Sequence, residues 1–229
     1  MSQAEQYSNH DAATVLLAAQ RLRCIRGDIT LFDELDLVLT EGKCIHIIGT
    51  NGSGKTSLLR ILCGLNRADF GDVTWQGESI SLNSQYHSDM AYLGHKDGLK
   101  NELTAFENLH FQQCLESCID DDSVDDCLAQ LEILHCAELP AQALSFGQRR
   151  RLAFARLLLL PKRLWILDEP LTGIDASGRK LIEGLCVKHL QEGGSIIMTH
   201  HQSLADSALG DLRQELHLGT FAAKQRTAI

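Results

Sequence analysis

A glycine-rich segment near residue 50 has the composition and spacing of a phosphate-binding loop. It reads Gly49-Thr-Asn-Gly-Ser-Gly54-Lys55-Thr56, which matches G-x-x-x-x-G-K-[ST], and it stands between an apolar run and an apolar helical pattern. Glycines let the backbone curl so that successive N–H groups point at phosphate oxygens. A chance glycine-rich turn would lack the flanking strand and helix patterns. The predicted nucleotide-binding residues are Gly49, Thr50, Asn51, Gly52, Ser53, Gly54, Lys55, Thr56 and Ser57.

Two adjacent carboxylates, Asp168 and Glu169, follow the apolar run Leu164–Leu167. Ligands of a parallel sheet bind at the carboxyl ends of its strands, so both acids can approach a nucleotide held by the loop. Lys55 suits a bridge between the β- and γ-phosphates, while the Thr56 hydroxyl and Asp168 suit Mg²⁺. Glu169 suits a group that orients and deprotonates the attacking water. The alternative, an acidic pair that only caps the next helix, does not account for the phosphate loop in the same chain.

A third motif, Leu144-Ser145-Phe146-Gly147-Gln148, opens a helical pattern that contains Arg149, Arg150, Arg151 and Arg156. Ser145 is a suitable N-cap. A serine hydroxyl and the unpaired N–H groups at a helix start form a second anion-binding position. Alone, this motif is weak evidence of function.

Strands and helices must position these motifs. Nearly continuous apolar runs predict buried parallel strands, and they are Cys44–Ile48, Met90–Leu93, Leu164–Leu167 and residues 195–199. Helical patterns at 57–65 and 178–190 alternate with them, which predicts an α/β domain with a mostly parallel sheet.

The alternation breaks between residues 96 and 160, where a capping box at Thr104 and Glu107 opens a helix and no strand pattern occurs. We therefore predict a helical subdomain over 96–160, inserted into a nucleotide-binding core made of 1–95 and 161–229.

Composition excludes several classes of protein. The 229 residues are 44% hydrophobic and 22% charged, which is ordinary for a globular chain, and the net charge of −9 argues against a nucleic-acid partner. No apolar run is long enough for a membrane span, and the polar N-terminus has no secretory signal pattern. The eight cysteines contain no Cys-x-x-Cys pair, so we expect reduced thiols packed as small apolar groups. We expect a cytosolic chain that docks on a membrane only through a partner.

The three motifs, in this order, resemble the ATP-binding subunits of ABC transporters over residues 16–218. The resemblance implies a P-loop NTPase core, with a mostly parallel sheet and an antiparallel N-terminal part, and an inserted helical subdomain. It also implies that a second copy of the chain completes an ATP sandwich. Ser145, Gly147 and Gln148 of one copy would then contact the γ-phosphate bound by the other.

Further roles follow from the same resemblance. A histidine after the last strand contacts the γ-phosphate in this family; His201 is preferred here, with His200 as the alternative. His95 takes the place of a glutamine that senses Mg²⁺. Phe146 stands where a small residue is common, and its side chain is expected to point to solvent. Arg26 lies near the usual adenine-stacking aromatic, as a stacking group or simply a surface residue.

The run from Tyr92 to His95 and the pattern over residues 98–109 are similar to the cytochrome c biogenesis ATP-binding export proteins. This resemblance implies a translocase-type ATPase that works with integral membrane permease subunits in cytochrome c maturation and acts indirectly on haem or a haem-loaded chaperone. It places the chain peripherally on the cytoplasmic face of the bacterial inner membrane. The alternatives are a subunit of an exporter with another cargo and a soluble ABC-type ATPase. The soluble class would need a coiled-coil insertion, tandem ATP domains or a basic face.

Overall fold

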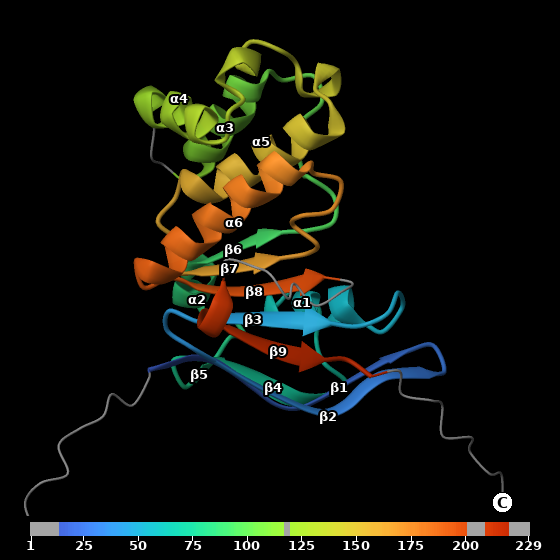
Figure 1. Cartoon of the computed structure of the whole chain (residues 1–229). Coiled ribbons are helices and arrows are strands. Elements are labelled where there is room, and N and C mark those ends of the chain that lie inside the picture. The colour runs from blue at the N-terminus through green and yellow to red at the C-terminus, as the bar shows by residue number, and fades with distance from the viewer. Residues whose placement is uncertain (1–13, 117–119, 201–208, 220–229) are drawn as a thin grey trace, which may run out of the picture.

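Two stacked sheets form the lower part of the molecule and helices form its upper part (Figure 1). The computed structural model describes residues 14–116, 120–200 and 209–219. The lower sheet is antiparallel and the sheet above it is parallel, which confirms the predicted P-loop NTPase architecture with an antiparallel N-terminal part.

The parallel sheet has the strand order β6-β7-β8-β3-β9. Its strands are β3 (Cys44–Ile48), β6 (Met90–Leu93), β7 (Leu164–Leu167), β8 (Ser195–His200) and β9 (Arg213–His217). The four apolar runs of the sequence are confirmed as strands. Every residue of β3 and β7 is buried, because helices or the second sheet cover both faces. β9 lies at the sheet edge, and all of its residues except Leu216 are polar, so it contains no apolar run that would predict a strand.

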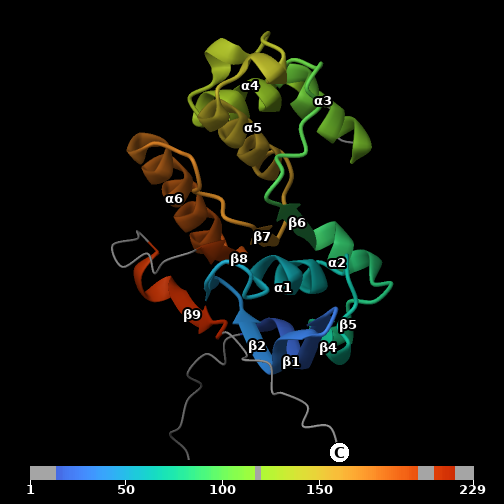
Figure 2. The same ribbon diagram turned by 90° about the vertical axis from the view of Figure 1, so that its right-hand side faces the viewer.

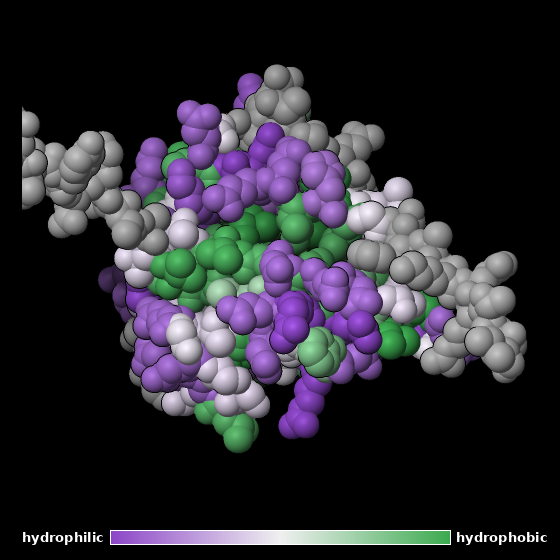
Figure 3. Space-filling view, turned by 90° about the horizontal axis from the view of Figure 1, so that it is seen from below, coloured by the Kyte–Doolittle hydropathy of each residue, from purple (hydrophilic) through white to green (hydrophobic). Residues whose placement is uncertain are grey.

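The antiparallel sheet has the order β2-β1-β4-β5. Its strands are β1 (Val15–Arg26), β2 (Ile29–Thr40), β4 (Phe70–Trp75) and β5 (Glu78–Ser79). A tight turn at Gly27, whose φ of 59° suits glycine, joins β1 to β2. Seen from below, apolar side chains gather along the middle of the molecule between hydrophilic ones (Figure 3).

Helix α1 (Lys55–Leu62) packs between the two sheets, where Leu58, Leu59 and Leu62 join one apolar core with both of them (Figure 2). The sequence predicted this helix over 57–65, so the observed helix begins two residues earlier and ends three residues earlier. The helix begins directly after Gly54, and it ends before Gly64, whose φ of 72° permits the left-handed turn that closes a helix.

The upper part contains α3 (Ala105–Leu115), α4 (Asp121–Gln130) and α5 (Phe146–Leu158) (Figure 1). Helix α6 (Ala176–Gln191) lies beside this group and packs against β8 of the parallel sheet (Figure 2). The predicted capping box is confirmed, since Thr104 and Glu107 exchange hydrogen bonds of 2.8 and 3.1 Å. In the described part of residues 96–160 no strand occurs. The shorter helices are α2 (Ser84–Asp89) and the 3₁₀ turns η1 (Leu134–Cys136), η2 (Ala141–Ala143) and η3 (Gly210–Leu212).

The described cysteines carry free thiols and all except Cys114 are buried, as expected for packed apolar groups. Burial raises the pKa of Cys44 to about 12, so that thiol stays protonated. None of the described helices has the length and apolar character that crossing a membrane requires.

Candidate nucleotide-binding site

The phosphate loop joins the carboxyl end of β3 to the first turn of α1. Gly52 and Gly54 have φ values of 82° and 98°, which only glycine adopts without strain, and they curl the backbone as predicted. The buried Lys55 folds back over the loop, and its Nζ donates to the carbonyl oxygens of Gly49 at 2.7 Å and Thr50 at 3.2 Å. The lysine is therefore held at the mouth of the loop, with its charge stabilised by backbone oxygens.

Ser53 is buried in the same loop, and its Oγ is among the buried polar atoms that have no hydrogen-bond partner in the described part of the chain. A Cβ on Gly49 would stand 2.4 Å from that oxygen, so only glycine fits there. A curled backbone, a cation and an orphaned hydroxyl suit an anionic ligand such as a triphosphate.

Asp168 is 1% exposed and lies at the end of β7. Its Oδ2 accepts a hydrogen bond from Thr56 Oγ1 at 2.9 Å, and its Oδ1 accepts one from Thr199 Oγ1 at 2.7 Å. Its N–H donates to the Leu93 carbonyl at 2.7 Å. Asp168 is thus bonded to α1 through Thr56 and to β8 through Thr199. The phosphate loop and the acidic segment lie next to each other, as the two motifs predicted.

Glu169 has a left-handed backbone, with φ at 50°. Such a conformation costs a non-glycine residue on the order of 1–3 kcal/mol and persists only where neighbours impose it. Its N–H donates to Thr199 Oγ1 at 2.9 Å, and its carboxylate accepts a long hydrogen bond of 3.4 Å from Thr172. The two acids therefore have separate surroundings, although they are adjacent in the chain.

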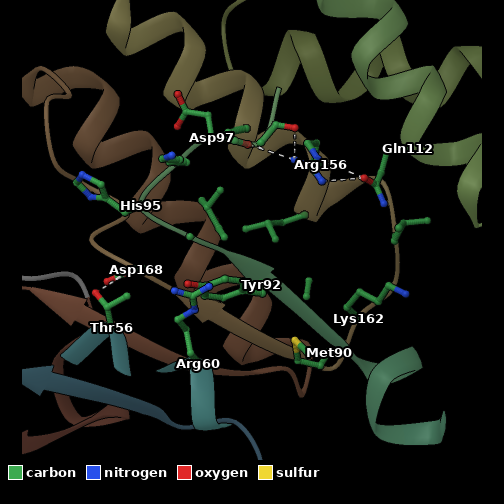
Figure 4. Close-up of a pocket in the computed structure, with 18 of the residues that line it drawn as sticks. Thr56, Arg60, Met90, Tyr92, His95, Asp97, Gln112, Arg156, Lys162 and Asp168 are labelled. Atoms are coloured by element: carbon green, nitrogen blue, oxygen red, sulfur yellow. Dashed lines mark hydrogen bonds between the residues drawn. The ribbon is translucent and has the colours of Figure 1, made fainter. Parts of the chain in front are cut away.

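A cavity of about 670 Å³ opens beside Asp168, between α1 and β6 on one side and α3 and α5 on the other (Figure 4). Thr56 and Asp168 line one part of it, and the exposed His95 lies in the same lining. Arg156 and Gln112 line the opposite wall and are hydrogen-bonded at 2.9 Å. Within the described ranges, no three His, Cys, Asp or Glu side chains are close enough together to hold a metal ion.

The Ser145 loop is organised around its own helix. Ser145 is the N-cap of α5 and forms a capping box with Gln148, with hydrogen bonds of 2.9 and 3.3 Å. Phe146 is 61% exposed, and its ring lies against Gly173, where an added Cβ would approach to 2.1 Å. A Cβ on Gly147 would meet nothing within 4 Å. This loop does not line the cavity beside Asp168.

The preferred histidine, His201, lies outside the described residues. His200 ends β8 and its ring lies 6.1 Å from that of His46. His46 is fully buried and both of its ring nitrogens lack a partner in the described part of the chain. Burial, followed by the nearby Arg213, lowers the pKa of His46 to about 4. Arg26 is exposed, and its guanidinium donates to the Ile25 carbonyl at 3.2 Å.

Sequence reasoning gave no role to two residues that hold the acids. Thr199 bonds to both acids, and Arg150 reaches the backbone of both from α5. The sequence does not distinguish Thr199 from any other threonine in an apolar strand. It also does not distinguish Arg150 from the other three arginines of its helix.

The sequence pattern of the ABC transporter family matches residues 32–172. A cytochrome c biogenesis ATP-binding export protein, CcmA, of Nitrosomonas europaea is 47% identical over 85% of this chain and 92% of its own length. The protein of the same name from Aliivibrio fischeri is 45% identical over 82% and 93%. This chain belongs to the ABC transporter family, among the cytochrome c biogenesis ATP-binding export proteins.

Solved structures of ABC transporter proteins share the fold. A nucleotide-free ATP-binding cassette superposes with a TM-score of 0.73 at 21% identity, and the match covers 90% of this chain and 88% of the other. An ATP-binding ABC transporter protein from Pyrococcus furiosus gives 0.75 at 21% identity, over 87% of this chain and 96% of the other. The family relation confirms the recognition that the three motifs supported.

Proposed function

We propose that this chain hydrolyses ATP to ADP and phosphate as the motor subunit of a membrane complex for cytochrome c maturation. The hydrogen bond between Thr56 and Asp168 carries the proposal, because it joins the phosphate loop to the acidic segment that follows β7 across 112 residues of sequence. The names of relatives at 43–47% identity support the physiological assignment.

The residues of the site fit MgATP. The Thr56 hydroxyl and the Asp168 carboxylate place hard oxygen donors 2.9 Å apart, which is the ligand type that Mg²⁺ prefers, and His95 is a further candidate ligand. When bound, the metal would neutralise charge on the phosphate oxygens. Lys55 would exchange its bonds to the Gly49 and Thr50 carbonyls for the β- and γ-phosphates.

Glu169 then acts as the general base. Its carboxylate orients a water molecule for in-line attack on the γ-phosphate and accepts the proton. Lys55 and the amides of the loop stabilise the charge that develops on the phosphate, and His201 is proposed to do so as well.

A second copy of the chain supplies the rest of the site. Ser145, Gly147 and Gln148 belong to a loop that does not line the cavity beside Asp168, and the open space at Gly147 leaves its backbone accessible to a ligand. We propose that this loop binds the γ-phosphate held by the other copy, with the anion at the start of α5.

The cavity beside the acids suits a permease subunit. Its wall combines buried apolar side chains, Leu157 and Leu160, with the cation Arg60 and with Lys162, which is paired with Glu116 of the same wall at 3.0 Å. We propose that it receives an amphipathic segment whose carboxylate meets Arg60. Docking there would hold the chain peripherally at the cytoplasmic face of the inner membrane. No nucleic-acid partner is proposed, and the cargo is proposed to be haem or a haem-loaded chaperone; an exporter for another cargo is the alternative.

Calorimetry of the full chain with MgATP and a phosphate-release assay test the chemistry. The wild type should bind and hydrolyse MgATP, whereas Lys55→Ala should lose about tenfold or more in affinity, because a hydrogen bond to a charged group is worth roughly 1.5–3 kcal/mol. No binding by the folded wild type, or near-normal hydrolysis by the variant, would overturn the assignment.

The physiological role needs a deletion strain. Complementation with the wild type should restore covalent haem on c-type cytochromes, and Lys55→Ala should not restore it. Normal c-type cytochromes in the deletion strain would favour an exporter of another cargo.

A further inference from the structure

Arg150 connects α5 to the acid segment at the end of β7. It is only 3% exposed, although arginine is seldom buried without partners. Its Nη2 donates to the carbonyl oxygens of Asp168 at 2.8 Å and Glu169 at 3.0 Å, and its Nε donates to that of Pro170 at 3.3 Å. Three consecutive carbonyls are therefore held by one side chain from a different element.

The remaining nitrogen of Arg150 bonds to the segment that follows β6. Its Nη1 donates to the Gly94 carbonyl at 3.1 Å and to Asp97 Oδ1 at 3.2 Å. Gly94 and Asp97 line the cavity that we assign to the permease partner. A guanidinium has five N–H donors in a rigid fork, and all of them have an acceptor here, whereas a lysine ammonium has three and cannot make the same set.

One of these bonds holds the backbone of Glu169, the strained residue of the site. The backbone of Glu169 has φ at 50°, and its N–H and C=O groups are hydrogen-bonded to residues of two different elements. Thr199 of β8 accepts from its N–H at 2.9 Å, and Arg150 of α5 donates to its C=O at 3.0 Å. The Glu169 C=O also accepts a hydrogen bond from the Thr172 N–H at 3.2 Å. Because a left-handed glutamate is strained, these contacts hold it in place, and loss of the bond from Arg150 would let the backbone relax and re-aim the carboxylate.

We propose that Arg150 is a positioning residue for hydrolysis. It holds Glu169 in the left-handed conformation that aims the carboxylate at the attacking water, and it joins that conformation to the Gly94–Asp97 segment of the cavity wall. A partner that displaces this wall thereby alters the aim of the base. The inference rests on the proposed function, because it presupposes that Glu169 acts on ATP.

Three variants of the full chain test this role, namely Arg150→Gln, Arg150→Lys and the control Arg149→Gln. Arg149 is the preceding residue of the same helix. It donates to the Ala141 carbonyl at 2.7 Å and shares the Asp97 carboxylate with Arg150, at 3.9 Å, but its guanidinium makes no hydrogen bond to Asp168 or Glu169 in the described part of the chain, so it isolates the contacts to the acids. Arg150→Gln should lower kcat by about 10- to 100-fold, because a small displacement of a reacting group has that effect. Its Kd for MgATP should stay within about threefold of wild type, since the phosphate loop is intact.

Arg150→Lys should fall between wild type and Arg150→Gln, and Arg149→Gln should keep the wild-type kcat. Thermal melts identify the variants that fold; if Arg150→Gln does not, Arg150→Lys carries the measurement. An unchanged kcat, or a loss of affinity as large as the loss of rate, overturns the proposal.

A double variant separates positioning from general damage to the fold. If Arg150 acts through Glu169, then Arg150→Gln should lower kcat little further in a Glu169→Gln background. Additive losses overturn the proposal. A wild-type chain that hydrolyses no ATP contradicts the proposed function, whereas a wild-type chain that hydrolyses ATP beside an equally active Arg150→Gln contradicts only this inference.

Discussion

The phosphate loop and the Ser145 loop differ in where the hydrogen-bond partners of their side chains lie. In the phosphate loop, Lys55 donates to carbonyls of its own loop, Thr56 donates to Asp168 at the end of β7, and the Ser53 hydroxyl has no partner in the described part of the chain. In the Ser145 loop, the serine only caps its own helix and the neighbouring Phe146 is 61% exposed.

This contrast indicates which part of the site a single chain can build. Around Asp168, elements from across the core converge, so Thr56, Asp168 and Thr199 are held in place by bonds within one chain. The Ser145 loop has open space at Gly147 instead, which suits contact with a second molecule. Arg150 belongs to the same helix as the Ser145 loop but contacts the acids, so it joins the two regions.

The largest expected effect concerns the acids beside the phosphate loop. Glu169→Gln should lower kcat by about 100-fold or more, because an amide cannot accept the proton of the attacking water. Affinity for MgATP should be retained, since the phosphate loop and Asp168 are unchanged. Phosphate release and calorimetry measure the two effects separately. Wild-type turnover by this variant would mean that Glu169 is not the general base and that another residue accepts the proton.

The next effect concerns the Ser145 loop. Ser145→Ala should lower turnover about tenfold, the value of one hydrogen bond to a charged group, and should lower the free energy of unfolding by about 1 kcal/mol through the lost N-cap. Affinity of the single chain for MgATP should not change.

Thr104→Ala is the matched control, because Thr104 caps α3 with the same capping box. It should lower stability by the same amount without lowering turnover. Equal turnover losses in the two variants would show that Ser145 acts only as a cap.

A third effect changes stability with pH, not turnover, and tests the burial of His46 in the core beneath the phosphate loop. His46 lies on β3, and burial lowers its pKa to about 4 from 6.5. Between these values the unfolded chain binds more protons than the folded one, so stability should fall as the pH drops from 6.5 to 4, by at most about 1.4 kcal/mol per pH unit.

Urea unfolding at several pH values should show a flatter slope for His46→Leu than for wild type. His135→Gln, at an exposed position, is the control and should keep the wild-type slope. An identical slope in all three proteins would place the pH dependence in other groups.

The smallest effect concerns Phe146, which stands where the ABC transporter family commonly has a small residue. Phe146→Ala should change the free energy of unfolding by only about 0.5 kcal/mol, as surface substitutions do, because the ring is mostly exposed. Turnover should change little as well. A large gain in turnover would mean that the ring obstructs the approach of a second copy.

Much of the fold could be predicted from the sequence, because buried parallel strands are continuous apolar runs and those runs are local. The strands Cys44–Ile48 and Leu164–Leu167 were predicted with their observed bounds. The edge strand Arg213–His217 was not, because at the edge of the sheet its residues are half-buried or exposed and all except Leu216 are polar. The phosphate loop was predictable for the same local reason, since its glycines, lysine and threonine occupy successive positions.

Residue types and spacing by themselves determined the reaction class, the acid pair and the parallel core, because each is written within a few consecutive residues. Only the tertiary structure decided which groups hold the acids in place. The carbonyls that Arg150 contacts lie 18, 19 and 20 residues away and a fourth lies 56 residues away, and any residue type offers a carbonyl. Backbone acceptors leave no trace in the residue types of a sequence, so their pairing becomes visible only when the chain is folded.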